Sequence, residues 1–173
     1  MRSFLFTALA IVTTMVASAQ DQDKSKRPSP PASVTQALAG GTEVTINYSQ
    51  PSVKGRTIGK DLEPKAGEVW RTGANEATTF EITKDVKIEG KTLPAGKYSL
   101  FTIAGTNEWT IIFNKTWNQW GAYKYKPDED ALRVKVKPGK AAQFAEKMTF
   151  TIDAKGTVTI LWGNLQVPFK VQG

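Results

Sequence analysis

The sequence predicts an all-β fold, an antiparallel β-sandwich with a jelly-roll-like arrangement of about ten strands. Two observations lead to this prediction. Apolar and polar residues alternate with a period of two in many short runs, as expected of strands that are half buried. Gly, Pro and Asn residues separate these runs at short intervals, as turns do between strands. Residues 32–173 are therefore expected to form one β-sandwich domain, which is long enough for a single core.

The expected strands follow one another from residue 33 onward. Residues 33–38 and 44–48 flank Gly40 and Gly41, so they predict a first hairpin. Residues 53–65 predict a long irregular loop, since they contain two glycines and a proline and show no alternation. The remaining strands are expected, in chain order, at residues 79–83, 86–88, 98–103, 109–113, 132–136, 148–152, 158–162 and 165–169.

Three segments carry more specific expectations. The runs at 98–103 and 109–113 are apolar on both faces, which predicts a central hairpin that is covered on both sides. Residues 140–147 predict the one helical turn of the domain. Gly163 and Asn164 predict a turn between the last two strands, so the chain is expected to close on a hairpin.

The N-terminus has the pattern of a cleaved signal peptide over residues 1–19. Arg2 supplies the basic start, residues 4–16 form the apolar run, and residues 17–19 match the A-x-A cleavage pattern. Residues 20–31 are charged and then proline-rich, so they predict an extended linker. The mature protein is expected in the periplasm or outside the cell, without a membrane-spanning helix after cleavage.

Composition restricts the chemistry. The chain contains no His and no Cys, which excludes Ser-His-Asp and Cys-His mechanisms, His-based zinc sites, thiol chemistry and a cysteine-linked lipid anchor. The formal net charge is +7, but basic residues are scattered beside acidic ones, so nucleic acid is not an expected partner. No cofactor is predicted.

The run GEVWRTGANEATTFEI, residues 67–82, gathers polar residues around a Thr-Gly turn. Arg71 has the geometry to bind a carboxylate or phosphate, and Asn75 and Glu76 the groups to orient a sugar or an amide. The alternative is structural: Arg71 and Glu76 form an ion pair that fixes the turn, while Asn75 bonds to the backbone.

A second cluster lies in NKTWNQWGAYKY, residues 114–125. Trp117, Trp120 and Tyr123 stand beside amides and lysines, and sugar-binding surfaces combine such rings with hydrogen-bonding groups. The alternative is that the two tryptophans cap the open end of the sandwich as a satellite of the core.

Five runs carry a family resemblance: RPSPP (27–31), YSQPSVKGR (48–56), WRTGANEATT (70–79), LPAGKYSLFTI (93–103) and FNKTWNQWGAY (113–123). On these runs the chain resembles an exported bacterial family catalogued as domain of unknown function 2911. The resemblance implies a mostly β domain, exported by Bacteroidetes-like bacteria. It carries no known activity, so no catalytic residue is transferred.

The leading hypothesis is a non-enzymatic, exported β-sandwich that binds a small molecule, a glycan or another cell-envelope component. Its predicted ligand-binding residues are Arg71, Asn75, Glu76, Trp117, Trp120 and Tyr123. One alternative is a carboxylate-based hydrolase of sugars or cell-wall material, with Glu76 and Glu68 as the candidate catalytic groups. Another is a structural or partner-binding envelope protein, which an exposed apolar patch would mark.

Acidic residues also occur in two expected loops, at Asp61, Glu63, Asp128, Glu129 and Asp130. Carboxylates bind calcium, but the spacing of a calcium-binding loop is absent. We therefore interpret these residues as solvated loop charges and predict no metal site.

Overall fold

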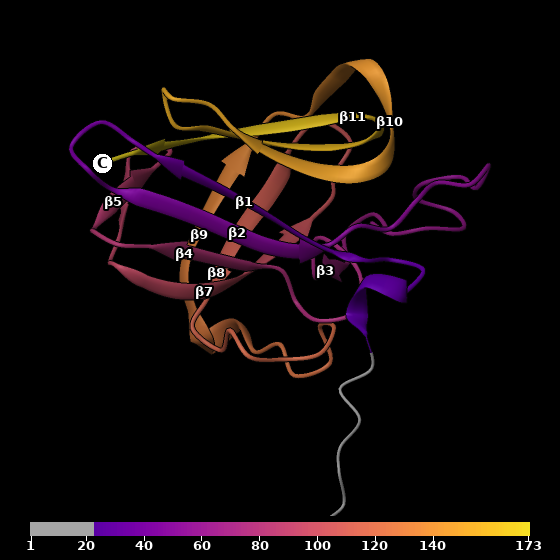
Figure 1. The fold of residues 1–173 in the computed structure, drawn as a ribbon, viewed down its shortest axis with the longest axis horizontal. Coiled ribbons are helices and arrows are strands. Elements are labelled where there is room, and N and C mark those ends of the chain that lie inside the picture. Colours follow the sequence, from indigo (N-terminus) through magenta and orange to yellow (C-terminus); the bar gives the residue numbers. More distant parts are fainter. Residues whose placement is uncertain (1–22) are drawn as a thin grey trace, which may run out of the picture.

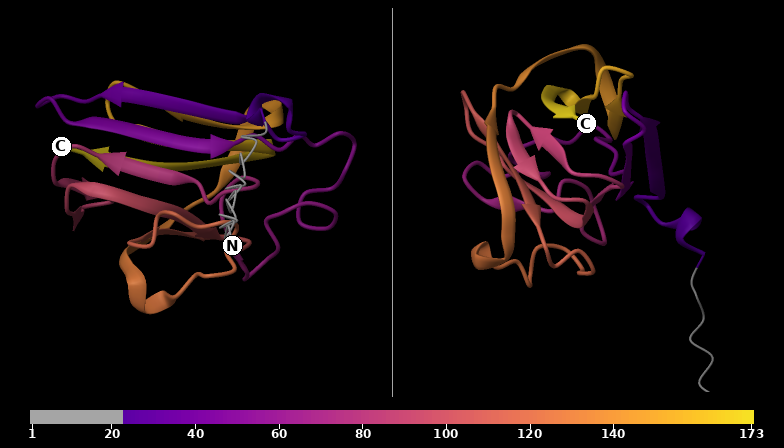
Figure 2. Two further views of the ribbon diagram at one scale, coloured as in Figure 1. Left: turned by 60° about the horizontal axis from the view of Figure 1, so that its bottom comes forward. Right: turned by 90° about the vertical axis from the view of Figure 1, so that its left-hand side faces the viewer.

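Two antiparallel sheets pack face to face in the computed structural model, which describes residues 23–173 (Figures 1 and 2). The first sheet has the order β1-β2-β4-β7-β8-β9, with β3 paired to β7, and the second has the order β10-β11-β5-β6. The predicted all-β sandwich is confirmed. In chain order the strands are β1 (Pro31–Ala37), β2 (Glu43–Ser49), β3 (Val69–Trp70), β4 (Thr79–Ile82), β5 (Val86–Ile88), β6 (Lys91–Leu93), β7 (Gly96–Ile103), β8 (Trp109–Asn114), β9 (Asp130–Val136), β10 (Gly139–Ile152) and β11 (Thr157–Gln172).

The core lies between the two sheets. Antiparallel register sets Ile46 opposite Phe80 and Phe80 opposite Tyr98, so their side chains share the inner face of the first sheet. Trp162 and Phe169 come from β11 in the second sheet, and both are almost fully buried. Aromatic packing joins the two sheets, because Phe169 lies 6.3 Å from Phe80 between ring centroids.

A smaller apolar cluster covers the opposite face of the first sheet. Phe101 on β7 pairs with Ile112 on β8, and both are fully buried although they point away from the main core. Ala122 and Tyr125, from the chain that follows β8, pack over them. The central hairpin is therefore covered on both sides, as its two apolar faces predict.

Two predictions near the C-terminus are wrong. Residues 140–147 belong to β10 rather than to a helical turn, and register shifts on both sides of Ala145 interrupt the alternation that would have identified a strand. Gly163 and Asn164 lie inside β11, so the last two expected strands are one long strand. Gly163 has φ +59° and pairs with Ala145, which shows that its positive φ serves a bulge and not a chain reversal.

Within residues 23–173 the helical content is two single turns of 3-10 helix, η1 (Lys24–Lys26) and η2 (Pro127–Glu129). Among residues 23–173, no helix is long and apolar enough to span a membrane. The predicted signal peptide, residues 1–19, and the first three residues of the predicted linker lie outside the described residues. The chain between β2 and β3 contains the expected long loop, which projects from one end of the sandwich (Figure 2).

Candidate ligand-binding site

The two sequence clusters meet through a backbone bridge. Glu76 and Trp120 form an isolated antiparallel bridge. The Ala77 amide donates to the Gln119 carbonyl at 3.0 Å, and the Gly121 amide donates to the Asn75 carbonyl at 3.0 Å. Residues directly opposite in an antiparallel pair project their side chains to the same face. The Glu76 carboxylate and the Trp120 indole are therefore neighbours on one surface.

The turn that carries Glu76 is held by its own hydrogen bonds. The Thr78 hydroxyl donates to the Thr72 carbonyl at 2.7 Å, and the Trp70 indole N–H donates to the Gly73 carbonyl at 3.1 Å. Thr72 and Asn75 have φ of 52° and 58°, in the left-handed region that Asn tolerates better than most residues. Gly73 packs closely, because a Cβ there would lie 3.1 Å from the Ser49 carbonyl oxygen. The sequence of the run thus fits a tight, fixed turn.

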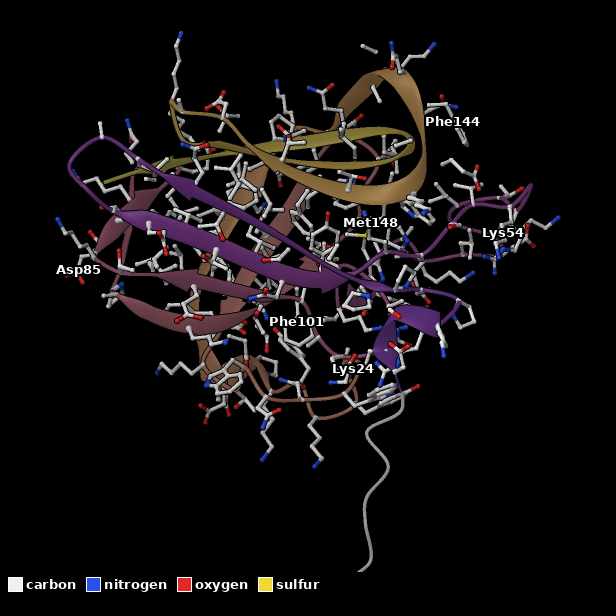
Figure 3. The ribbon with its side chains drawn as sticks, in the orientation of Figure 1. Lys24, Lys54, Asp85, Phe101, Phe144 and Met148 are labelled. Carbon is white, nitrogen blue, oxygen red and sulfur yellow. The ribbon has the colours of Figure 1, made fainter. Side chains whose placement is uncertain are left out.

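Glu76 is paired with the N-terminal segment rather than with Arg71. Arg27 donates from Nη1 to both carboxylate oxygens at 3.0 Å, and Lys24 Nζ lies 3.6 Å from Oε1. Figure 3 labels Lys24, which lies in the short helix η1 ahead of β1. Asn75 donates from Nδ2 to the Ser29 carbonyl at 3.0 Å. The structural alternative of an Arg71–Glu76 ion pair is therefore wrong, while Asn75 does bond to the backbone.

The charge state of Glu76 follows from these contacts. Burial by itself raises the pKa of the carboxyl, but its backbone hydrogen bond and the nearby Arg27 and Lys24 together lower the pKa below its ordinary value. Glu76 is accordingly ionised at neutral pH. A general acid needs the opposite, a carboxyl that keeps its proton near neutral pH. Glu68, the second carboxylate of the hydrolase hypothesis, is exposed next to β3. It is not among the residues that line the small groove beside Glu76 on the outer face of the first sheet.

A small groove lies beside this carboxylate, on the outer face of the first sheet. Its volume is about 190 Å³, and Asn47 on β2 and Thr79 on β4, which are register partners, belong to its lining. The N-terminal segment closes one side, and the Glu76 turn closes another. The complete lining is Lys24, Pro31, Asn47, Tyr48, Ser49, Glu76, Ala77 and Thr79.

One residue of the groove lining, Thr79, has a buried polar atom without a hydrogen-bond partner. In the described part of the chain, three buried side-chain atoms lack a partner: Arg71 Nε, Thr79 Oγ1 and Gln119 Oε1. Arg71 and Thr79 belong to the polar run of the sequence, and Gln119 accepts a hydrogen bond from that run through its carbonyl. Thr79 also lines the groove, and a ligand hydroxyl that reached its buried Oγ1 would complete its hydrogen bonding.

The tryptophans are open to solvent. Trp117 is 43% exposed and Trp120 is 54% exposed, so the alternative that they cap the sandwich as satellite core is wrong. Each ring carries a cation: the Arg27 guanidinium carbon lies 5.9 Å from the Trp120 ring centroid, and Lys97 Nζ lies 4.7 Å from that of Trp117. Lys97 also pairs with Glu81 at 3.2 Å, on the outward face of β7 and β4.

The structure thus gathers three of the six predicted ligand-binding residues, Asn75, Glu76 and Trp120, at one place. Trp117 lies over Lys97 on the adjoining part of the sheet, and Tyr123 is 86% exposed beyond Gly121. The sequence prediction missed Lys24, Arg27 and Thr79. Arg27 lies in the run RPSPP, but its partner Glu76 is 49 residues away, and no local pattern indicates such a contact.

The match to a family model covers nearly all of the described chain. The model named "Protein of unknown function (DUF2911)" matches residues 29–171. The chain belongs to this family. In this DUF2911 protein, Glu76, Thr79 and Trp120 lie inside the matched region, while Lys24 and Arg27 precede it. No curated protein and no solved structure matches the chain.

The acidic residues of this DUF2911 protein form no cluster suited to a metal ion in the part of the chain that the structure describes. Over residues 23–173, no group of three or more Asp or Glu side chains is placed to hold a metal ion. Asp130 is instead engaged in hydrogen bonds: Asn114 Nδ2 donates to Oδ1 at 2.8 Å, and the Tyr125 hydroxyl donates to Oδ2 at 2.8 Å. This network anchors the base of the loop that carries Trp120.

Proposed function

We propose that this protein is an exported binding protein for a hydroxyl-rich ligand, such as the end of a glycan or a related component of the cell envelope. The observation that carries the proposal is the placement of the half-exposed Trp120 ring beside the ionised Glu76 and the polar groove. Sugars present an apolar face that stacks on an aromatic ring and hydroxyls that need directional hydrogen bonds. The site offers both kinds of contact.

The groove supplies donors and acceptors of different kinds. The Glu76 carboxylate keeps lone pairs beyond the two that Arg27 uses, so it can accept from ligand hydroxyls. Lys24 donates, and the unpartnered Thr79 hydroxyl and the Asn47 amide both donate and accept. The volume of about 190 Å³ is below the roughly 300–1,000 Å³ of pockets for drug-sized ligands. We therefore expect one sugar unit to enter, with any further units lying across the surface.

The proposal is tested by calorimetric titration of residues 23–173 with mono- and disaccharides and with soluble peptidoglycan fragments. We expect saturable binding of at least one of these ligands. Trp120→Ala should weaken it about tenfold or more, because a stacked aromatic anchor is among the contacts that dominate binding. Phe144→Ala, which removes an exposed ring elsewhere, is the matched control and should bind as the parent does.

Two outcomes would overturn the proposal. One is a panel in which no ligand binds to the parent protein. The other is a ligand whose affinity is the same for the parent and for Trp120→Ala, since the ring would then have no part in recognition.

A further inference from the structure

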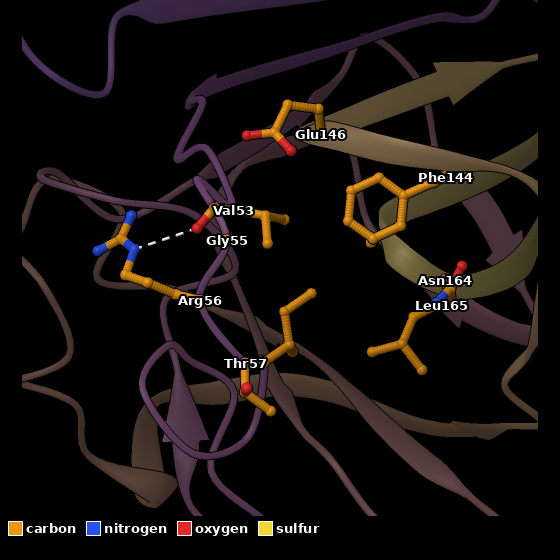
Figure 4. Close-up of a pocket in the computed structure, with 10 residues that line it drawn as sticks. Val53, Gly55, Arg56, Thr57, Phe144, Glu146, Asn164 and Leu165 are labelled. Carbon is orange, nitrogen blue, oxygen red and sulfur yellow. Dashed lines mark hydrogen bonds between the residues drawn. The ribbon is translucent and has the colours of Figure 1, made fainter.

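A larger cavity lies at the end of the molecule where the loop after β2 meets the β10–β11 hairpin. Its volume is about 580 Å³, within the range typical of small-molecule sites. Val53 and Ile58 of the loop contribute to its wall, as do Phe144 of β10 and Leu165 of β11. Figure 4 shows the Val53, Phe144 and Leu165 side chains converging on a common space. This cavity shares no lining residue with the polar groove.

The loop side of the cavity is firmly attached to the edge of β10. Ser52 and Lys147 form an isolated antiparallel bridge, and the Val53 amide donates to the Glu146 carbonyl at 2.9 Å. The Lys54 amide donates to Glu146 Oε1 at 2.8 Å. Arg56 returns to the loop backbone, donating from Nε to the Val53 carbonyl at 3.1 Å. The wall is thus formed before any ligand arrives.

The hairpin side owes its shape to the irregularity of β10. The register shifts on both sides of Ala145 turn Phe144 outward, where 54% of the residue is exposed. Gly163, opposite Ala145, lets the loop approach, because a Cβ at this position would lie 2.6 Å from Cδ1 of Ile58. The two mispredicted segments of the sequence are the ones that form this side of the cavity.

The lining of the cavity favours an apolar ligand. No lining residue is among those with an unpartnered buried polar atom in residues 23–173. The polar lining groups are either bonded or open to water: Glu146 accepts from the Lys54 backbone amide, Arg56 donates to carbonyls, and Thr57 and Asn164 are exposed. An apolar chain would therefore gain contact with Phe144, Ile58 and Leu165 without leaving a polar group unsatisfied.

The charged residues at the mouth of the cavity favour a ligand whose polar end is negatively charged. Arg56 and Glu146 are the charged residues of the lining, and the exposed Lys54 lies between the lining residues Val53 and Gly55. Neither cation takes part in an ion pair within residues 23–173. Figure 3 shows Lys54 on the projecting loop and Phe144 on β10, at the same end of the molecule. The mouth is consequently positive, and the wall is apolar.

We propose that this cavity binds a free fatty acid, with the aliphatic chain among Phe144, Ile58 and Leu165 and the carboxylate at the rim near Lys54 and Arg56. The site does not depend on the proposed glycan groove. It assigns the protein a second ligand class, a single-chain anionic amphiphile. The chain contributes the apolar contact, and the carboxylate orients it toward solvent.

The test is displacement of a dansyl-labelled undecanoate from the purified protein, followed by fluorescence below the critical micelle concentration. Dodecanoate should displace the probe, while hexanoate and dodecyltrimethylammonium should each require about tenfold or more higher concentration. Phe144→Asp and Asn164→Trp, at two exposed lining positions, should weaken probe binding about tenfold. Tyr123→Asp, at an exposed aromatic outside the cavity, is the matched control and should bind as the parent does.

Three results would overturn the proposal: no probe binding to the parent, equal displacement by the cationic and anionic amphiphiles, or unchanged binding in both cavity variants. Size-exclusion chromatography of the same proteins tests whether a second copy of the chain covers the cavity instead. A parent that dimerises through this face, with Phe144→Asp monomeric and no amphiphile bound, would assign the cavity to a second copy and overturn the fatty-acid site. Circular dichroism verifies that each variant is folded.

Discussion

The polar groove and the apolar cavity differ in how their polar atoms are satisfied. The groove contains a buried hydroxyl on Thr79 without a partner and an ionised Glu76 that faces solvent. In the cavity, Glu146 and Arg56 already bond within the protein, and the apolar side chains of Val53, Ile58, Phe144 and Leu165 form the wall together with the exposed Thr57 and Asn164. The first site retains a buried polar atom with unmet hydrogen-bonding capacity, whereas the second has no such atom among the described residues that line it and exposes mainly apolar surface.

This difference shows two ways in which one sandwich can prepare a binding surface. An unsatisfied buried hydroxyl lowers the free energy of unfolding of the free protein, and a ligand that bonds to it recovers that free energy. The groove should therefore make the free protein less stable and its ligand affinity higher. Exposed apolar surface is common in folded proteins and does not by itself distinguish one apolar ligand from another. The ligand selectivity of the cavity should therefore depend on its shape and on the charges at its rim. Each half of the comparison can be tested by a substitution that leaves the other half unchanged.

The largest expected effect comes from removing the unpartnered hydroxyl. Thr79→Val should stabilise the free protein by about 1–3 kcal/mol, because an unsatisfied buried hydroxyl is replaced by a methyl group of the same shape. It should weaken glycan binding at the same time. Urea unfolding measures the first effect and calorimetry the second. Thr102→Val is the matched control: its hydroxyl accepts from Thr72 at 3.1 Å, so its loss should destabilise. Destabilisation by Thr79→Val would contradict the contrast between the two sites.

The next effect concerns the cavity. Gly163→Ala should destabilise by about 1–2 kcal/mol, because a non-glycine residue is strained at positive φ and the new Cβ displaces Ile58. Gly67→Ala isolates the strain, since Gly67 also has positive φ but a Cβ there meets nothing within 4 Å. Urea unfolding should show a larger loss for Gly163→Ala. Equal losses would mean that the contact with Ile58 is not limiting, and a loss of glycan binding would mean that the two sites are not independent.

A smaller effect is expected at Glu76. Its side chain is 42% exposed, so Glu76→Gln should cost less than about 1 kcal/mol. Because the folded-state pKa is lowered from 4.5, the stabilisation is present above that pH and is lost as the pH falls through the folded-state value. Unfolding free energies of parent and variant should therefore differ at neutral pH and converge in acid. A difference that grows in acid would contradict the assigned ion pair, and Glu81→Gln reports the behaviour of another exposed pair.

The smallest effect separates the two tryptophans. Trp117→Ala should change glycan affinity by less than about twofold, within the 0.5 kcal/mol of an ordinary surface substitution, because this ring lies over Lys97 rather than beside Glu76. The measurement is the same calorimetric titration used for Trp120→Ala. Equal losses from the two variants would show that the ligand spans both rings and that the groove is only part of the site.

The fold was more predictable from the sequence than the site was. Strands such as β2 and β9 are buried on one face, so burial leaves an alternating pattern in the sequence. In β10 the extra residues of the register shifts destroy that pattern, and in β11 Gly163 imitates a turn. Local periodicity cannot reveal such irregularities, because they are set by the partner strand.

The site was predictable only in part, for a related reason. Asn75, Glu76 and Trp120 are predictable as site residues because their residue types are unusual for plain strands. Glu76 and Trp120 meet through a backbone bridge between residues 44 positions apart. Arg27 and Glu76 are 49 residues apart, and both β1 and β2 lie between them in the chain. Contacts of this length follow from packing of the whole domain. The sequence therefore indicated the members of the site better than their arrangement.

The ion pair between Arg27 and Glu76 has a consequence for affinity. Any ligand hydroxyl that needs the lone pairs used by Arg27 competes with a cation belonging to the protein itself. If opening the pair costs about 1 kcal/mol, only about one molecule in six is ready to bind, and the apparent Kd is about six times the intrinsic one. Salt weakens such a pair. An uncharged sugar should then bind more tightly as ionic strength rises, the reverse of what a charged site usually shows.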